Sequence, residues 1–407
     1  MLNKNDDKRT QKRPPREEGI HIESSGYFLS LSNKYKKASR IIYLILAASF
    51  IITLLFNAKL MTYTNFSYLI RDLNSAAELA EENYNSISYD NDDMRVTEAF
   101  RGGIITVSSS DIAIYTATGR RTLYMNEDFL SPKIAISKKY AVAYDLGGNK
   151  FSVYNSFAKV YTETLDYPIS SVTASDNGWL AVVTKDASHI SVVNIYDDDF
   201  KLRSSYSFAS AYVMFVDINE KCDKLAICKI ESGIDKYSTS LLVSELINDK
   251  KVFDIPICRG VPYGGSFVEG GAFQLASTDG YFLIDSDDGD ILNKYDFNGM
   301  NSNRATFEKN GCAISLSDNS GVVNNLILVF DKNGNIVYNT NIADGILDIE
   351  LSANDLFINH EDKISKTDIK NGNISTTYVS DTGSDIIIYD GNNILLCCKT
   401  KAKYIKM

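Results

Sequence analysis

The chain has 407 residues, of which 44% are hydrophobic, and a formal net charge of −10. The charge is unevenly distributed, because residues 1–40 hold 10 basic and 5 acidic side chains whereas residues 62–407 hold 31 basic and 47 acidic ones. A body with a net charge of −16 repels phosphate backbones, which argues against nucleic acid as its partner.

Residues 1–40 are predicted to form a disordered, basic, cytoplasmic tail. Their KNDDKRTQKRPPREEG stretch is polar, charged and interrupted by prolines, so it buries too little apolar surface to fold. The next stretch, residues 41–56, reads IIYLILAASFIITLLF and carries no charge. Counted from Ile41 to Met61 it contains 21 residues, and about 20 helical residues cross a hydrocarbon core of ~30 Å. We therefore predict a transmembrane helix over residues 41–61 that contacts the lipid bilayer.

The basic flank of this segment predicts its orientation. By the positive-inside rule, a single-pass protein with this flank has its N-terminus in the cytoplasm and its C-terminal domain outside the cell membrane. A cleaved signal peptide is the alternative, but its best cleavage point, after Ala58, places Phe56 where a small residue is needed. Over residues 62–94, helical spacing and the run SAAELAEEN predict a membrane-proximal helix and linker, which serves either as a stalk or as a dimerisation helix.

From about residue 95 to residue 407 the sequence repeats. One kind of strand-like run occurs eight times at spacings of 37 to 48 residues, which is about the length of a four-stranded propeller blade. The runs are GIITVSS from Gly103, YAVAYDL from Tyr140, WLAVVTK from Trp179, KLAICKI from Lys224, AFQLAST from Ala272, CAISLSD from Cys312, DLFINHE from Asp355 and NILLCCK from Asn393.

Turn residues divide these repeats into strands. Pairs that suit tight hairpins precede several of the runs: Asn177-Gly178, Gly270-Gly271, Asn310-Gly311 and Asp390-Gly391. We predict an all-β fold, an extracytoplasmic β-propeller of eight four-stranded blades. Seven blades are the alternative if the long fourth unit, residues 213–262, is irregular. The last unit supplies three strands, and a ring must close, so a strand before Gly103, in SISYD or RVTEAF, is predicted to complete it.

No catalytic, cofactor-binding or metal-binding residues are predicted. Asp285, Asp287, Asp288 and Asp290 resemble part of a calcium loop but lack its remaining ligands, so a hairpin turn is the preferred interpretation. The three histidines, His21, His189 and His360, show no metal-site spacing, and the glycines of residues 263–273 are interpreted as turn and bulge glycines. The six cysteines form no CxxC pair, and we predict buried free thiols, with a Cys222–Cys258 disulfide as the alternative.

Three stretches carry a family resemblance: YDLGGNKFSVYN from Tyr144, TLDYPI from Thr164 and SDNGWLAVVT from Ser175. With them the chain resembles a family of single-pass membrane proteins from clostridia and related Gram-positive bacteria, catalogued as a domain of unknown function. The resemblance implies a membrane-anchored propeller and brings no catalytic residues. Asp145, Gly147, Gly148 and Lys150 of the first stretch either shape a tight loop, which we prefer, or line a ligand mouth.

The predicted function is a non-enzymatic binding or scaffold module for a protein or cell-envelope ligand. Propellers present many loops on a rigid frame, and no catalytic spacing was found. The alternatives are a quinone-cofactor or polysaccharide-acting enzyme, and an envelope sensor that signals through the cytoplasmic tail. The ligand-binding residues are unknown from the sequence.

Overall fold

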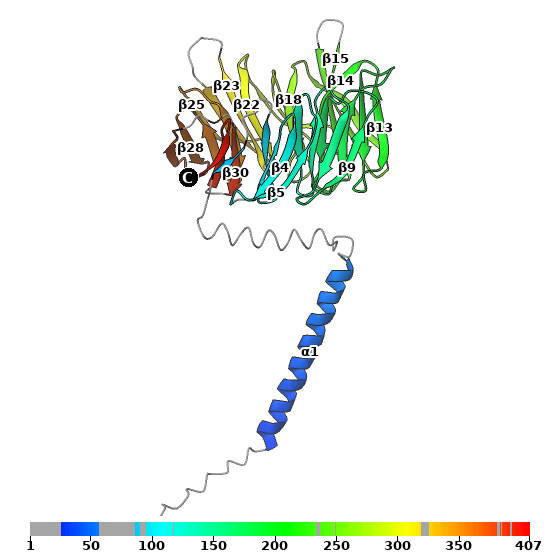
Figure 1. The fold of residues 1–407 in the computed structure, drawn as a ribbon, viewed down its shortest axis with the longest axis vertical. Coiled ribbons are helices and arrows are strands. Elements are labelled where there is room, and N and C mark those ends of the chain that lie inside the picture. The colour runs from blue at the N-terminus through cyan, green and yellow to red at the C-terminus, as the bar shows by residue number, and fades with distance from the viewer. Residues whose placement is uncertain are drawn as a thin grey trace, which may run out of the picture. The chain divides into compact units, whose positions relative to one another are not determined.

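The computed structural model describes residues 26–56, 86–89 and 95–407, apart from short gaps at 117, 233–236, 249, 319–324, 381–382, 384 and 391–392 (Figure 1). The chain separates into two compact units, Met1–Leu69 and Ile70–Met407. The tail up to residue 25, with His21, lies outside the described residues, and so do residues 57–85, which cover most of the predicted membrane-proximal helix.

The first unit contains one described helix, α1 (Gly26–Phe56). It begins inside the segment predicted to be disordered, so that prediction is wrong for residues 26–40. The physical reason is that neither proline nor glycine follows Gly26 within this stretch, and a helix propagates through such a sequence. Among the described residues, no helix is both long and apolar enough to cross a membrane. The predicted span over residues 41–61 continues beyond Phe56 and stays a prediction.

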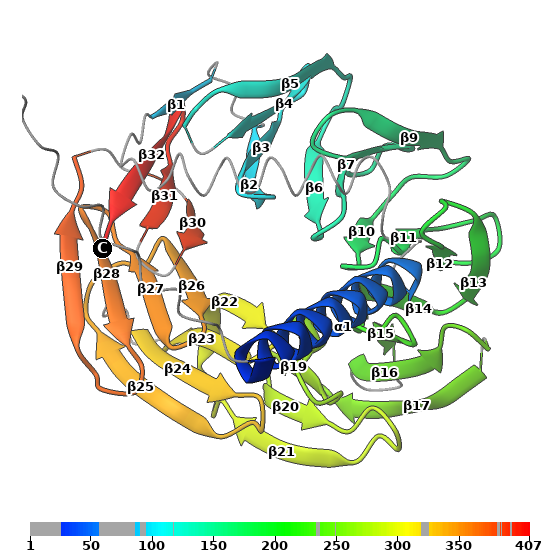
Figure 2. The same ribbon diagram turned by 90° about the horizontal axis from the view of Figure 1, so that it is seen from below.

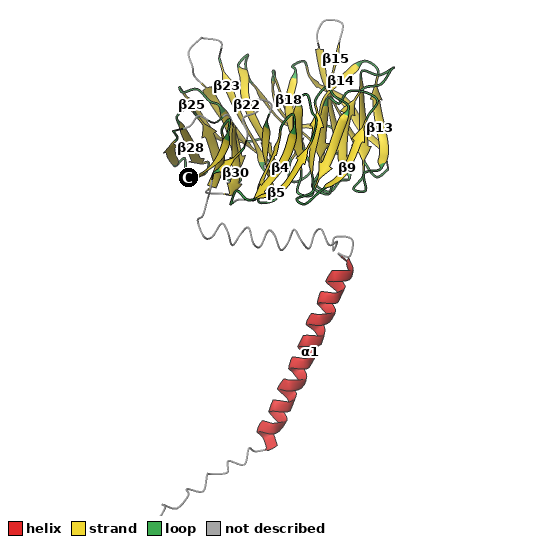
Figure 3. Cartoon of the chain, in the orientation of Figure 1, coloured by secondary structure: helices red, strands yellow, loops and turns green. Residues whose placement is uncertain are grey.

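The second unit is a ring of eight four-stranded antiparallel sheets (Figures 2 and 3). In the described residues its 32 strands follow one another blade by blade, and the first strand of each blade contacts the first strands of both neighbouring blades. The first strands therefore line the axis and the fourth strands form the rim. The predicted all-β propeller of eight four-stranded blades is confirmed, and the seven-bladed alternative is wrong.

The blades have these strands, in order from the axis to the rim. Blade 1 has β2 (Val96–Phe100), β3 (Gly103–Val107), β4 (Asp111–Thr116) and β5 (Arg121–Asn126). Blade 2 has β6 (Pro132–Ile136), β7 (Ala141–Asp145), β8 (Lys150–Tyr154) and β9 (Lys159–Thr164). Blade 3 has β10 (Ser171–Ala174), β11 (Leu180–Thr184), β12 (Ser191–Tyr196) and β13 (Leu202–Phe208). Blade 4 has β14 (Ala211–Ile218), β15 (Lys224–Ser232), β16 (Tyr237–Glu245) and β17 (Lys250–Cys258).

Blades 5 to 8 repeat the arrangement. Blade 5 has β18 (Pro262–Phe267), β19 (Phe273–Ser277), β20 (Gly280–Ile284) and β21 (Ile291–Asp296). Blade 6 has β22 (Asn301–Glu308), β23 (Gly311–Ser317), β24 (Asn325–Asp331) and β25 (Ile336–Ile342). Blade 7 has β26 (Asp348–Ser352), β27 (Asp355–Asn359), β28 (Lys363–Asp368) and β29 (Ile374–Tyr378). Blade 8 has β30 (Asp385–Asp390), β31 (Asn393–Cys397), β32 (Lys401–Lys406) and β1 (Ile87–Ser88).

The eight recurring runs of the sequence are the second strands of the blades. Every residue of β3, β11 and β19 is buried, because these strands have a strand on each side and a neighbouring blade on each face. The fourth strands, such as β9, alternate between partly buried and exposed residues because one face meets solvent. The described core accordingly forms eight apolar clusters, each between two neighbouring blades. In one of them Tyr281 of blade 5 stacks on Phe330 of blade 6, with ring centroids 4.1 Å apart.

The ring closes through β1. Ile87 pairs with Ala402 and Ser88 with Lys401, so the last blade takes its outermost strand from residues that precede blade 1. The Tyr89 hydroxyl extends the contact by donating to the Cys398 carbonyl at 2.6 Å. The predicted closing strand in SISYD is confirmed, whereas RVTEAF supplies β2, the innermost strand of blade 1.

Turns sort onto two faces of the ring. Turns between first and second strands, and between third and fourth strands, lie on what we call the hairpin face. The remaining connections lie on the opposite face. Gly311 begins the second strand of blade 6 on the hairpin face with φ 143°, and a Cβ there would lie 1.9 Å from the Phe330 carbonyl oxygen. Glycine is therefore required at this predicted Asn-Gly turn.

Two sequence alternatives are settled by blade 4. Its strands β15, β16 and β17 are nine residues long, which explains the wide spacing of the fourth repeat without any irregularity. All six cysteines are free. The alternative Cys222–Cys258 disulfide is wrong, because Cys222 lies in a turn on the hairpin face and Cys258 ends β17 at the opposite face. The prediction of free thiols is confirmed, but only four of the six are buried, because Cys258 and Cys398 are partly exposed.

Candidate functional site

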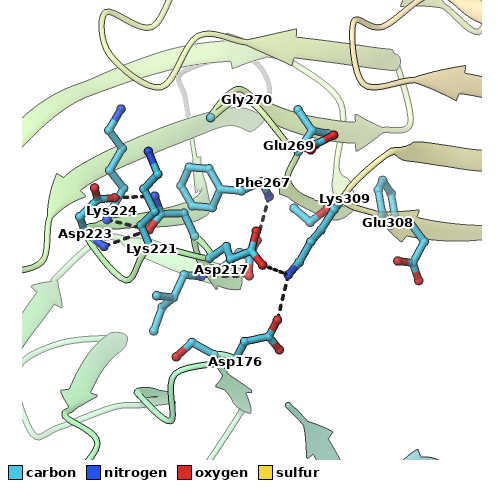
Figure 4. Close-up of a pocket in the computed structure, with 18 of the residues that line it drawn as sticks. Asp176, Asp217, Lys221, Asp223, Lys224, Phe267, Glu269, Gly270, Glu308 and Lys309 are labelled. Atoms are coloured by element: carbon cyan, nitrogen blue, oxygen red, sulfur yellow. Dashed lines mark hydrogen bonds and ion pairs between the residues drawn. The ribbon is translucent and has the colours of Figure 1, made fainter. Parts of the chain in front are cut away.

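A cavity of about 710 Å³ opens among the hairpin-face turns (Figure 4). It is lined by the ends of the first strands of blades 2 to 6 and by the turns that follow four of them. Tight turns favour polar and small residues. Each of these blades therefore places polar or small side chains in the turn between its first and second strands, around the cavity. We call this cavity the mouth.

Four charged side chains connect blades across the mouth, and we call Lys138, Asp176, Glu220 and Lys309 the clasp. The Lys309 ammonium lies 2.8 Å from Asp176 Oδ2 and 3.1 Å from Glu220 Oε1. Lys138 lies 2.8 Å from the same Asp176 oxygen. Because Lys309 belongs to blade 6 and its partners to blades 3 and 4, its side chain reaches past blade 5.

The clasp fixes the charge states of its members. Burial alone would lower the pKa of Lys309, but the hydrogen bonds and negative charges of Asp176 and Glu220 outweigh it and raise that pKa. Burial alone would likewise raise the pKa of Asp176, but hydrogen bonds from Lys138 and Lys309 outweigh it and lower that pKa. Lys309 and Asp176 are therefore ionised at neutral pH.

Asp217, near the end of β14, also lines the mouth (Figure 4). Its Oδ2 accepts a hydrogen bond from the Phe267 amide at 2.8 Å, and its Oδ1 accepts one from the Ile218 amide at 2.9 Å. Burial raises its pKa to about 6, and burial also raises the pKa of Glu308, another residue of the lining. Within the described residues, neither carboxylate forms an ion pair with a basic side chain.

Further carboxylates lie on the innermost strands. Glu98 on β2, and Asp348 and Glu350 on β26, are close enough to influence one another's ionisation. Burial and neighbouring negative charge raise the pKa of Glu98 to about 7, that of Asp348 to about 6 and that of Glu350 to about 8. We call these three the axial carboxylates.

The predicted calcium-like loop is a hairpin turn. Asp285 Oδ1 accepts from the Asp287 amide at 2.8 Å, and Asp288 Oδ1 accepts from the Asp290 amide at 2.9 Å. Asp287 also pairs with Lys224 at 2.6 Å, at the edge of the mouth. The turn interpretation is confirmed. In the described part of the chain, no three His, Cys, Asp or Glu residues are placed to hold a metal ion.

The loop that carries the family resemblance lies on the opposite face. Asp145 Oδ1 accepts from the Ser131 amide at 2.6 Å, and the Gly147 amide donates to the Ile169 carbonyl at 2.8 Å. A Cβ on Gly148 would lie 2.2 Å from Asp145 Oδ2, so glycine is needed for the tight loop. The structural interpretation of this motif is confirmed. His189 pairs with Asp186 in blade 3 and His360 lies in blade 7, so the structure does not bring the two histidines together.

The mouth was not predicted from the sequence. Gly270 and Gly271 are turn glycines, as predicted, with φ 107° and 97°, but with Glu269 they also line the cavity. The acidic and basic residues of the clasp are spread over four blades and 172 positions of sequence, from Lys138 to Lys309. The signal that could have found them is their common place, since all four lie in turns between first and second strands.

Comparison with solved structures shows the fold. BamB from Moraxella catarrhalis is 11% identical with a TM-score of 0.56, over 80% of this chain and 99% of that chain. Chaetomium thermophilum Sqt1, bound to the N-terminus of the ribosomal protein L10, is 11% identical with a TM-score of 0.54, over 79% and 100%. The dihydro-heme d1 dehydrogenase NirN, in complex with DHE, is 12% identical with a TM-score of 0.52, over 70% and 66%.

Sequence comparison identifies the family. No curated protein matches the sequence of this chain. Residues 79–407, which include every described strand of the ring, match a single family description. The chain therefore belongs to the Family of unknown function (DUF5711).

Proposed function

We propose that this chain is a non-enzymatic binding or scaffold module that engages a protein or cell-envelope ligand through the mouth. The observation that carries the proposal is the cavity of about 710 Å³, to which five consecutive blades contribute. A cavity of this size falls in the range of about 300–1,000 Å³ that is typical of ligand sites. Sqt1 was solved with a polypeptide terminus bound, which supports a protein ligand for a ring of this kind.

We further propose that the module is held at the outer side of a cell membrane by residues 41–61. Support comes from the charge change across this segment and from the large apolar side chains of α1 from Ile41 to Leu46 and at Ile51 and Ile52, which are exposed. The test is labelling of intact cells with a membrane-impermeant amine reagent. Modification of propeller lysines before lysis supports this location, and modification only after lysis contradicts it.

Binding through the mouth is tested by crosslinking on intact cells that express the full chain. The variant Asp176→Asn/Glu220→Gln removes both carboxylates that hold Lys309. The control Asp362→Asn changes an exposed carboxylate in the β27–β28 turn, on the opposite face. We expect a partner that is captured by the wild type and the control but lost from the double variant. Equal capture by all three proteins would remove the mouth from the proposal.

A polysaccharide-acting enzyme is the second candidate, because the axial carboxylates supply one observation in its favour. Hydrolysis of glycosides needs one protonated and one ionised carboxyl group. The pKa of Glu350, about 8, is higher than that of Asp348, about 6, so Glu350 would supply the protonated group and Asp348 the ionised one. Release of reducing ends from purified cell-wall polysaccharide by the wild type, and its loss in Glu350→Gln, would support the enzyme.

A sensor is tested by replacing residues 1–40 with a neutral sequence. If the protein is a scaffold it should keep its function after this replacement, and if it is a sensor it should lose its signal.

A further inference from the structure

We propose that the mouth binds a lysine- or arginine-bearing polypeptide segment, and that Lys309 is a built-in competitor for the same carboxylates. The inference rests on the proposed function and names the chemistry of its ligand. It is carried by the geometry of the cavity and of the clasp together.

The lining of the mouth has an excess of negative charge. It contains seven carboxylates and three ammonium groups: Asp176, Asp217, Glu220, Asp223, Glu269, Asp287 and Glu308 against Lys221, Lys224 and Lys309. Two of the three lysines are already engaged, because Lys224 lies 2.6 Å from Asp287 and Lys309 is held by the clasp. Two lysines outside the lining, Lys138 and Lys332, pair with Asp176 and Glu269, so seven carboxylates still face five lysines. A cationic ligand therefore finds complementary charge here, whereas an anionic one is repelled.

Lys309 marks where a ligand ammonium group fits. Its nitrogen lies between the carboxylates of blades 3 and 4, at 2.8 and 3.1 Å, although its backbone belongs to blade 6. The side chain is 45% exposed, so it can leave the two carboxylates for solvent when another cation takes its place. Asp217 offers a second position, since its described partners are the amides of Phe267 and Ile218 rather than a basic side chain.

The size of the mouth favours a polypeptide over a single ion. A volume of about 710 Å³ holds several residues of a peptide, and no three described metal-ligating side chains converge on a metal position. The carboxylates form two groups, Asp176 with Glu220 around Lys309, and Asp217 on two backbone amides, and these groups suit successive basic side chains of one segment.

The probe is an N-acetylated hexalysine amide, added to the purified full chain at low salt, with affinity measured by fluorescence anisotropy. We expect binding that weakens in 0.5 M salt, because exposed ion pairs are screened. Asp217→Asn should weaken binding by about fivefold, the effect of one charge pair, while Asp362→Asn leaves it unchanged. Lys309→Met should strengthen binding by about fivefold, because it removes one of the two lysines that compete for Asp176 and Glu220, the other being Lys138. Its control is Lys185→Met, which removes the same charge from an exposed position on the opposite face.

Three outcomes would overturn the inference. The first is that the Asp217→Asn and Asp362→Asn proteins bind hexalysine with equal affinity. The second is that the Lys309→Met and Lys185→Met proteins bind it with equal affinity. The third is that a hexalysine whose amino groups are acetylated binds the wild type as tightly as the unmodified peptide. Spermine that binds as tightly as hexalysine would assign the mouth to a free polyamine instead. Thermal unfolding of each variant verifies that the ring is intact. If capture on cells depends on the mouth while hexalysine fails to bind, the binding module stands and the ligand class is wrong.

Discussion

The axial carboxylates allow a quantitative prediction for Glu350→Gln. Burial, followed by the negative charge of Asp348, raises the pKa of Glu350 from 4.5 to about 8. Ionisation of Glu350 therefore lowers the unfolding free energy of the folded protein. This loss is absent below pH 4.5 and complete above pH 8. The full pKa difference between the folded and unfolded states corresponds to at most about 5 kcal/mol of unfolding free energy. Screening by solvent near this half-buried group reduces the expected effect to about 1–2 kcal/mol. The variant should be more stable than the wild type by that amount at pH 9 and nearly equal to it at pH 5.

The assay is urea unfolding followed by intrinsic fluorescence at both pH values. Glutamine retains an oxygen that can accept the 3.1 Å hydrogen bond from the Thr306 hydroxyl, so the substitution changes mainly the charge. The matched control is Glu269→Gln, because Glu269 is exposed and its pKa is lowered by Lys332 rather than raised. The control should show no gain at pH 9. A Glu350→Gln protein that is less stable than the wild type at pH 9, or equally shifted at both pH values, would refute the reasoning.

Three further predictions concern the ring itself. Ile87→Ala, at a 1% exposed position of the closing strand, should cost about 2–5 kcal/mol of unfolding free energy in urea, and an unchanged midpoint would contradict closure through β1. Glu127→Gln should cost about 3 kcal/mol at pH 7, because a fully buried carboxylate 2.6 Å from Lys150 is neutralised. Burial opposes ionisation of Glu127, but hydrogen bonds from Lys150 and two other residues lower its pKa, so in thermal melts the cost should shrink as the pH falls below the ordinary carboxyl value of 4.5. Gly311→Ala should cost about 1–3 kcal/mol, and Gly345→Ala, where a Cβ meets nothing within 4 Å, should cost little.

Most of the fold could be predicted from the sequence because the blade imposes the same demand eight times. Each second strand is enclosed on both faces, and so runs such as LAVVT of β11 are continuously apolar. The turns that precede them require positive φ, which explains the recurring glycines such as Gly178. Closure was predictable because three strands in the last unit leave one edge unpaired. The start of α1 could not be predicted. The polar, charged composition of residues 1–40 indicated disorder, whereas the local helix propensity after Gly26 favours a helix.

The candidate site could not be predicted, because no local pattern encodes it. Asp176, Glu220 and Lys309 each occupy a turn in which a polar residue is ordinary, and each is uninformative alone. Their meaning comes from the ring, which brings the turns of blades 3, 4 and 6 to one mouth. The same holds for Glu127, a connecting residue whose carboxylate is enclosed by lysines from two strands of blade 2.

The positions that stabilise the ring are different from the positions of the clasp. Stability depends on the buried second strands and on the clusters between blades, none of which contains a clasp residue. The clasp side chains are partly exposed, with Glu220 at 61% and Asp176 at 24%, and exposed ion pairs contribute only about 0–1 kcal/mol each. The turn residues are therefore free to vary in charge while the strands are not. A cluster of opposite charges that joins turns of four blades therefore lies at positions where the packing of the fold does not require it.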